Sequence, residues 1–331
     1  MNQHHHIAIA LENLEKSTGI KGKWKPSKQL TLDGTLELIV NKQRFSLNVL
    51  VKNELRNYQL SAIIEESKKN NPMLLIANHI FPKIKEALRT HNIQYLETNG
   101  NIYLKHNGSI LWIDNHKPVK SIKQKGNRAF TKTGLKVLLH FLLNEEDINL
   151  PYRELAANTN VALGNINNII HGLLDMGYLA RLDRNQYKLI NKKELLEKWM
   201  TAYADKLKPS LKIGQFRFLN NDFLDWKSLH LKKNKTWWGG EAAGDLLTDF
   251  LRPENLTLYT TETRSELIKN YRLFPDEQGN INVYQKYWYN DELNTNTVPP
   301  LLVYADLMNE GDRRSVETAK KIYHEYLQDR F

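Results

Sequence analysis

The chain has 331 residues, of which 41% are hydrophobic and 25% are charged, and this composition is typical of a folded globular protein of two or three domains. It contains no cysteine, which excludes disulfides and thiolate catalysis, and its apolar runs are too short for a signal peptide or membrane span, so we expect a cytoplasmic protein. The formal net charge of +10 favours an anionic partner such as nucleic acid.

Helix and strand patterns alternate over the first third of the chain. A basic loop with two glycines is expected over 19–28, and Asn41 and Lys42 are expected to join two strands as a hairpin. The predicted helices cover 7–16, 55–69 and 81–92, and the predicted strands cover 31–40, 43–51, 71–78, 93–104 and 109–113. Residues 1–120 are therefore predicted to form an α/β domain with a mixed sheet covered by helices.

This first domain resembles the restriction-endonuclease-like fold, in which an acid at one strand end and an acid-x-Lys pair on the next strand hold a divalent metal. Asp33 and Lys52 occupy the corresponding places, but the position two before Lys52 is Leu50, and Asn48 stands where a further acid could help. Because Mg²⁺ needs carboxylate oxygen, we expect a nuclease-shaped domain without bound metal and without catalytic residues. The alternative for Lys52 is an ordinary solvent-facing lysine at a strand end.

A basic segment without acidic residues follows this domain. Its cationic side chains are Lys117, Lys120, Lys123, Lys125, Arg128 and Lys132. The segment is either a solvated tether or a strip that lies along a DNA backbone, and in the second case Lys125 and Arg128 are the expected phosphate contacts.

Residues 127–192 carry the pattern of a winged helix-turn-helix. A strongly apolar helix over 130–144 is followed by a short helix over 151–159, which Pro151 opens, and by a helix that starts after Asn160. Gly177 suits a left-handed helix end, and residues 178–190 alternate around a turn at Asp183–Asn185, which predicts the wing.

The third helix is the expected recognition helix. Leu163, Ile166, Ile170, Leu173 and Leu174 should face inward, which leaves Asn165, Asn167, Asn168 and His171 on the opposite face. Asparagine can pair bidentately with adenine in the major groove, while Arg181, Arg184 and Lys188 on the wing should neutralise phosphates of double-stranded DNA. The alternative is a winged helix used only for protein contacts.

A helix over 192–207, ended by Pro209, should lead to a second α/β domain over 205–331. Glu241 should begin a helix, and Asp306 should end an apolar strand that starts at Leu301. These two acids either bind metal or serve in nucleotide transfer, with Arg313 and Arg314 at another helix start holding phosphate, or they are ordinary capping residues. We expect Trp237 and Trp238 to be core residues rather than a stacking surface for a nucleobase.

Three stretches together resemble the abortive-infection type IV antitoxin family, the AbiEi-like transcriptional regulators. They are IQYLETNGNIYL at 93–104, the winged helix, and WGGEAAGDLLTDFLRPENLTLYT with the later PPLLVYADL. The resemblance implies a non-enzymatic, DNA-binding repressor of its own operon in a bacterial phage-defence locus, without cofactor. It also implies a nucleotidyltransferase-like toxin that is a functional partner without a stable complex. Family members often carry the winged helix at the start of the chain, whereas here it is central. The alternative function is a metal-dependent nuclease that the winged helix guides to its target.

Overall fold

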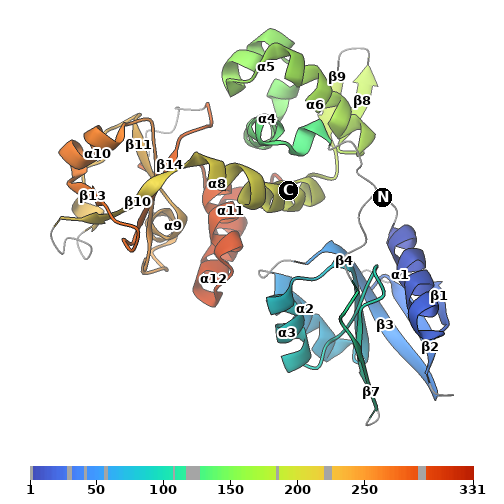
Figure 1. The fold of residues 1–331 in the computed structure, drawn as a ribbon. Coiled ribbons are helices and arrows are strands. Elements are labelled where there is room, and N and C mark those ends of the chain that lie inside the picture. The colour runs from blue at the N-terminus through green and yellow to red at the C-terminus, as the bar shows by residue number, and fades with distance from the viewer. Residues whose placement is uncertain are drawn as a thin grey trace. The chain divides into compact units, whose positions relative to one another are not determined.

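The computed structural model describes residues 3–27, 32–40, 43–55, 59–106, 109–116, 127–183, 186–219, 226–289 and 296–331 (Figure 1). The chain divides into two compact units, Met1–Lys123 and Gln124–Phe331, which we call unit 1 and unit 2. Both units combine helices with a sheet, as the predicted α/β class requires.

Unit 1 is built on a seven-stranded mixed sheet whose strands follow chain order. The central pairs β3–β4 and β4–β5 are parallel, and the outer pairs are antiparallel. The strands are β1 (Gly22–Pro26), β2 (Gly34–Val40), β3 (Gln43–Glu54), β4 (Met73–His79), β5 (Gln94–Glu97), β6 (Ile102–His106) and β7 (Ser109–Ile113). The helices are α1 (Gln3–Thr18), α2 (Leu60–Lys69) and α3 (Pro82–Thr90).

The side chains on the two faces of this sheet contribute to two separate apolar cores. Ile7, Ala10 and Leu14 of α1 belong to one core, while Ile63 of α2 and Ile84 of α3 belong to the other. The sheet is thus covered on both faces, as parallel strands at its centre require. The predicted basic loop over 19–28 is wrong in part, because Gly22–Pro26 forms β1; this edge strand is mostly exposed and so carries little apolar alternation.

Unit 2 begins with three helices and a two-stranded hairpin, in the predicted order. We call residues 127–189 the helix–hairpin module. Its elements are η2 (Arg128–Phe130), α4 (Lys132–Leu143), η3 (Glu145–Asn149), α5 (Tyr152–Thr159), α6 (Leu163–Asp175), β8 (Leu179–Asp183) and β9 (Gln186–Leu189). Gly177 adopts the predicted left-handed conformation, with φ +72°. Two predictions in this module are wrong. Pro151 is the N-cap of α5 and not part of its first turn. Leu163 is 45% exposed and not buried, because it lies in the first turn of α6.

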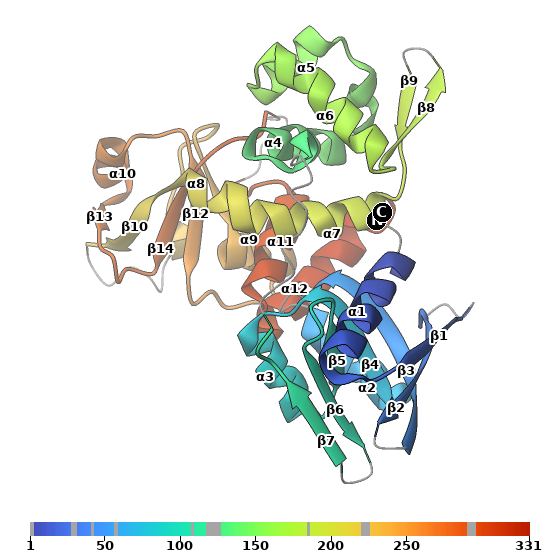
Figure 2. The ribbon, with the colours of Figure 1, turned by 45° about the vertical axis from the view of Figure 1, so that its right-hand side comes forward.

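A long helical segment connects this module to the second sheet. It consists of α7 (Lys192–Ala202), the π-helical turn η4 (Tyr203–Leu207) and α8 (Lys208–Leu211). Pro209 does not end the helix as predicted, because α8 starts anew after the π turn and a proline is tolerated in a first helical turn. Figures 1 and 2 both show α7 between α4 and α11.

The rest of unit 2 is a five-stranded sheet in the order β11-β12-β14-β10-β13, with β12 and β14 parallel. The strands are β10 (Lys212–Phe218), β11 (Thr236–Gly239), β12 (Leu256–Thr260), β13 (Leu273–Pro275) and β14 (Ile281–Gln285). The helical elements are α9 (Gly240–Thr248), α10 (Arg264–Tyr271), α11 (Pro300–Glu310), α12 (Arg313–Ile322) and the π-helical turn η6 (Tyr323–Leu327).

The predicted strand from Leu301 to Asp306 is wrong, because these residues lie in α11. The segment is apolar on most of its surface, since α11 packs against α7, α9, α12 and β11, and such a run lacks the periodicity that separates helix from strand. One apolar cluster extends from Ala129 of the module to Leu327 and includes Trp237 and Trp238, which are core residues as predicted. Within the described residues, no helix is long and apolar enough to cross a membrane.

Candidate functional site

The outer face of α6 presents the side chains predicted to contact DNA bases. Asn167, Asn168 and His171 are exposed and Asn165 is half-buried, while Ile166 and Ile170 on the opposite face are buried. The side-chain amide of Asn168 donates to the carbonyl oxygen of Gly164 at 3.1 Å within the same helix. Thus α6 offers a neutral, hydrogen-bonding surface on a helix anchored by its apolar side.

The β8–β9 hairpin follows α6 in the chain and carries cations that were predicted to contact DNA phosphates. Arg181 and Lys188 are exposed. The guanidinium of Arg181 lies 5.6 Å from the ring centroid of Tyr187 and donates to its hydroxyl at 3.2 Å, so Arg181 is stacked on the neighbouring strand. This contact raises the pKa of Arg181, and the side chain keeps its positive charge.

Arg128 is exposed on η2, which packs against α6. Asn127, the residue before Arg128, connects η2 to α6. Its side-chain amide donates to the carbonyl oxygen of Gly172 at 2.7 Å, and its Oδ1 accepts from the backbone N–H of Ala129 at 2.8 Å. Arg128 is therefore placed beside the C-terminal half of α6. The remaining predicted DNA contacts, Lys125 and Arg184, lie outside the described residues.

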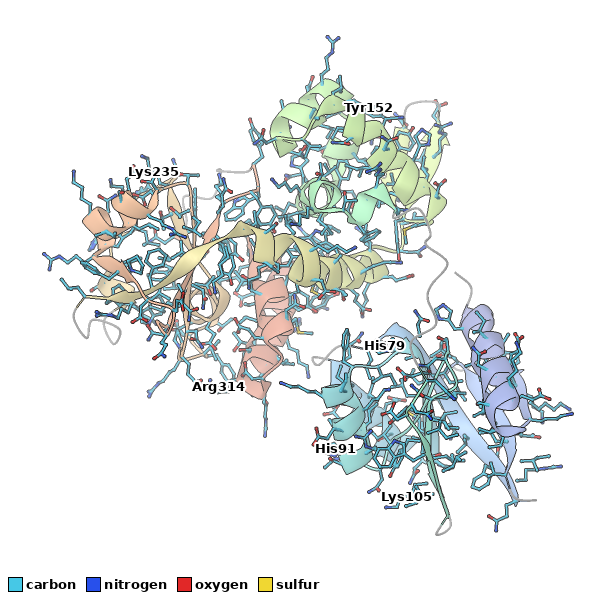
Figure 3. All side chains as sticks on the ribbon, in the orientation of Figure 1. His79, His91, Lys105, Tyr152, Lys235 and Arg314 are labelled. Atoms are coloured by element: carbon cyan, nitrogen blue, oxygen red, sulfur yellow. The ribbon has the colours of Figure 1, made fainter. Side chains whose placement is uncertain are left out.

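A second candidate site is a cleft of about 650 Å³ in the C-terminal part of unit 2. It brings together Glu241, Arg313 and Arg314, three of the four residues that the sequence singled out there. Figure 3 shows Arg314 at the N-terminal end of α12. The complete lining is Lys208, Glu241, Glu254, Asn255, Thr257, Asn282, Tyr284, Glu310, Asp312, Arg313 and Arg314.

Three carboxylates converge in this cleft. One oxygen from each of Glu241, Glu310 and Asp312 lies within 4.8 Å of the others. Burial raises the pKa of Glu310 to about 7, and the nearby Asp306 and Glu241 carboxylates add to this effect against the opposing charge of Lys208. The cleft thus holds three carboxylates together with the cationic side chains of Lys208, Arg313 and Arg314.

Asp306, the fourth residue, lies beneath the cleft in a buried network. Its Oδ1 accepts from Lys208 Nζ at 2.7 Å and from the Tyr203 hydroxyl at 3.0 Å, and its Oδ2 accepts from the Tyr259 hydroxyl at 2.9 Å. Burial and the Asp306 charge raise the pKa of both tyrosines well above the ordinary value, so they remain neutral donors. Asp306 therefore joins the connecting helix to β12 and α11.

Two glycines allow α9 to start close to the sheet. Gly240 has φ +50°, and a Cβ there would lie 2.8 Å from Thr257 Oγ1; a Cβ on Gly239 would lie 2.5 Å from the Tyr259 ring. This close approach sets Glu241 at the wall of the cleft.

In unit 1, Asp33 directly precedes β2, and Lys52 lies on the neighbouring strand β3. The Asp33 carboxylate accepts from the backbone N–H of Val51 at 2.6 Å, and Lys52 is paired with Ala77 of β4. Leu50, at the position where an acid would bind metal, packs against an apolar core.

Sequence reasoning missed Lys208, Glu310 and Asp312 as cleft residues. The stretch Glu310–Gly311–Asp312 contains a signal for the two acids, because a left-handed glycine followed by an N-capping aspartate marks the junction of two helices. Lys208 carries no such signal, since its position depends on the π turn before it.

One family model matches a C-terminal segment of the chain. Residues 188–328 match the model of a family described as "Transcriptional regulator, AbiEi antitoxin, Type IV TA system", which confirms the predicted resemblance over this segment. The match starts on β9, so α6 lies before it, and it includes the whole cleft lining. No curated protein and no solved structure matches the chain.

Proposed function

From the match of residues 188–328 to the AbiEi antitoxin family of transcriptional regulators, we propose that this protein binds DNA at the promoter of its own type IV toxin–antitoxin operon and represses it. The observation that carries the proposal is the exposed polar face of α6, directly followed by a cationic hairpin and packed in one unit with the matched segment. The toxin is proposed as a functional partner that this protein counteracts without a stable complex.

The α6 face fits base recognition in the major groove. Asn167, Asn168 and His171 carry donors and acceptors but no permanent charge, so they distinguish base edges rather than attract any phosphate. The buried opposite face fixes the helix on α4 and α5, and it keeps these side chains pointing outward.

The hairpin and η2 fit contacts to the DNA backbone. Arg181, Lys188 and Arg128 are exposed cations on the elements that follow and flank α6. Such contacts supply affinity and orientation but carry no sequence information.

The test separates the two kinds of contact by anisotropy titrations on the operon promoter and on scrambled DNA over a range of salt. Replacing Asn165 or Asn168 by Ala should cost about 1 to 3 kcal/mol at the operator and leave binding to scrambled DNA nearly unchanged. Replacing Arg181 or Lys188 by Ala should weaken binding to both DNAs and lower the salt slope by about one unit.

Lys269→Ala provides a matched control, since Lys269 is an exposed cation on α10, away from the helix–hairpin module. It should leave the operator affinity nearly unchanged. If the wild-type protein shows no salt-sensitive binding to either DNA, the proposed operator recognition fails, and the module is left as a surface for protein contacts.

We further infer that unit 1 has the form of a nuclease without its activity. Leu50 supports this inference, because it packs into a core where a metal site needs a carboxylate. The alternative is a metal-dependent nuclease, which predicts plasmid cleavage in Mg²⁺ or Mn²⁺. Cleavage that disappears in Asp33→Ala and Lys52→Ala variants would establish that alternative.

A further inference from the structure

We propose that two copies of this protein associate through the outer edge of β7, so that their sheets join by antiparallel pairing across a two-fold axis at Leu111. The interface lies in unit 1. A dimer would carry two helix–hairpin modules, the number that a palindromic operator requires. This consequence rests on the proposed function, whereas the interface itself does not.

β7 is an edge strand with one unpaired side. It is the last strand of the sheet, next to β6, as Figure 2 shows. Among the described residues of the chain, no second strand pairs with its outer side. Alternate residues of an edge strand direct their backbone N–H and C=O groups away from the sheet. These groups are available to a further antiparallel strand.

The two edges of the sheet differ in charge. β7 has the sequence Ser-Ile-Leu-Trp-Ile, without a charged residue or a proline. β1, at the other edge, carries exposed Lys23 and Lys25 and ends at Pro26, which has no N–H. When an edge strand pairs with a copy of itself, each charge on it approaches a like charge, which opposes pairing. The neutral edge at β7 therefore suits a second copy of the chain, and the edge at β1 does not.

The exposed side chains of β7 complement each other across the proposed axis. Ile110 and Trp112 lie on one face of the strand and are 62% and 57% exposed. With the axis at Leu111, antiparallel pairing places Ile110 of each copy opposite Trp112 of the other. An aromatic side chain opposite a β-branched one is a favourable cross-strand pair. Leu111, which is half-buried on the other face, would meet Leu111 of the second copy.

Trp112 is already held in position. The guanidinium of Arg89 lies 4.7 Å from the centroid of its ring. Arg89 in turn donates to the Tyr95 hydroxyl at 2.9 Å and lies 3.9 Å from the carboxylate of Asp114. A side chain that is fixed in this way loses little conformational freedom when a partner covers it. β7 thus presents an exposed aromatic ring that is prepared for association.

The association should be weak and should stop at two copies. Because β7 has only five residues, the interface belongs to the small class that buries less than about 1,200 Å² in total. The two-fold pairing uses the β7 edge of both copies, and the lysines on β1 oppose further growth at the other edge. We therefore expect a concentration-dependent dimer and not a fibre.

Sedimentation velocity of the full-length protein without DNA tests the proposal. The wild type should change from monomer to dimer as its concentration rises through the micromolar range. Ile110→Lys/Trp112→Lys should remain monomeric, and so should Ile110→Glu/Trp112→Glu, because like charges would face each other across the axis. An equimolar mixture of the two double variants should dimerise again, since lysines of one copy then face glutamates of the other.

Ile39→Lys provides a matched control. Ile39 is 53% exposed on β2, which has partner strands on both sides, so this variant should dimerise like the wild type. Circular dichroism checks the folding of every variant.

Three results would overturn the interface: a wild type that stays monomeric, folded double variants that still dimerise, or a mixture of the two variants that forms no dimer. A monomeric wild type would leave the edge of β7 to a strand of a different protein. Operator binding is measured separately, and its absence would not change the sedimentation result.

Discussion

Asp306 shows how one buried charge links distant parts of unit 2. It is 0% exposed, and its partners Lys208, Tyr203 and Tyr259 come from the connecting helix and from β12. A carboxylate of this kind is costly to bury, and it is tolerated because every donor around it is aligned.

Asp306→Asn should destabilise unit 2 by about 3–5 kcal/mol, because Lys208 would keep a buried charge without its counter-ion. Urea unfolding measures the effect. Asp249→Asn is the matched control, since the Asp249 side chain is 92% exposed and should matter by less than about 0.5 kcal/mol. Equal stability of the two variants would contradict the role given to Asp306.

Glu310 makes stability depend on pH in a defined direction. Its pKa is raised by burial from the ordinary 4.5 to about 7 in the folded protein, so the folded state binds this proton more tightly than the unfolded state. The contribution to stability is fully present below about pH 4.5 and is lost as pH rises towards about 7.

Glu310→Gln should remove this pH-dependent loss of stability. The neighbouring residues desolvate the Glu310 carboxylate, but the residue as a whole is exposed, so solvent screening should limit the gain over wild type to about 1 kcal/mol at pH 8. The gain should be smaller at pH 5. Urea unfolding of both proteins at the two pH values checks this, and a difference independent of pH would refute it.

At the scale of elements, glycines decide how closely helices pack. In α4, a Cβ on Gly134 would lie 2.3 Å from the carbonyl oxygens of Arg128 and Ala129, and these are backbone atoms of η2. In α6, a Cβ on Gly164 would meet nothing within 4 Å. The close packing of η2 on α4 therefore requires a glycine at position 134, whereas no contact requires one at position 164.

Gly134→Ala should destabilise unit 2 by about 1–3 kcal/mol, because η2 cannot move away without breaking its contacts with α6. Gly164→Ala should be neutral or stabilising by up to about 1 kcal/mol, as alanine is the better helix former. Thermal unfolding compares them directly. A larger loss for Gly164→Ala than for Gly134→Ala would contradict this account of the packing.

At the scale of the whole molecule, the two units have separate cores. Trp199 on α7 is 0% exposed, and its Nε1 donates to the carbonyl oxygen of Leu135 at 2.9 Å. It also stacks on Tyr203 at 5.0 Å between ring centroids. Through these contacts the helix–hairpin module and the C-terminal sheet share one cluster, so unit 2 should unfold as one body.

Trp199→Ala should lower the stability of unit 2 by about 3–5 kcal/mol and leave unit 1 unchanged. Leu96→Ala, in a core of unit 1, should lower the stability of unit 1 and leave that of unit 2 unchanged. Differential scanning calorimetry should show two transitions, each shifted by one variant only. A shift of both transitions by either variant would show that the units are thermodynamically coupled.

Periodicity alone determined most elements of this protein. The alternation in β2 and β3, the apolar faces of α4 and α6, and the left-handed Gly177 are local features, and each was predicted from neighbouring residues. The resemblance to the antitoxin family was also visible in the sequence, because its motifs are continuous stretches.

The tertiary structure determined those secondary-structure elements that local sequence patterns do not specify. The segment 301–306 is helical rather than extended because several elements surround it and bury it on most sides, which removes the polar face that would have revealed its period. Pro209 falls inside a helix because a π turn restarts that helix before it.

The cleft likewise belongs to the tertiary structure. Glu241 and Glu310 are distant in the chain, and they meet only because α9 and α11 pack on each other, with Gly240 allowing α9 to start against β12. A sequence specifies which side chains can ionise, coordinate or donate. Their approach to within a few ångströms is set by the packing of whole elements, because the energy that holds them together comes from the shared core rather than from the acids themselves.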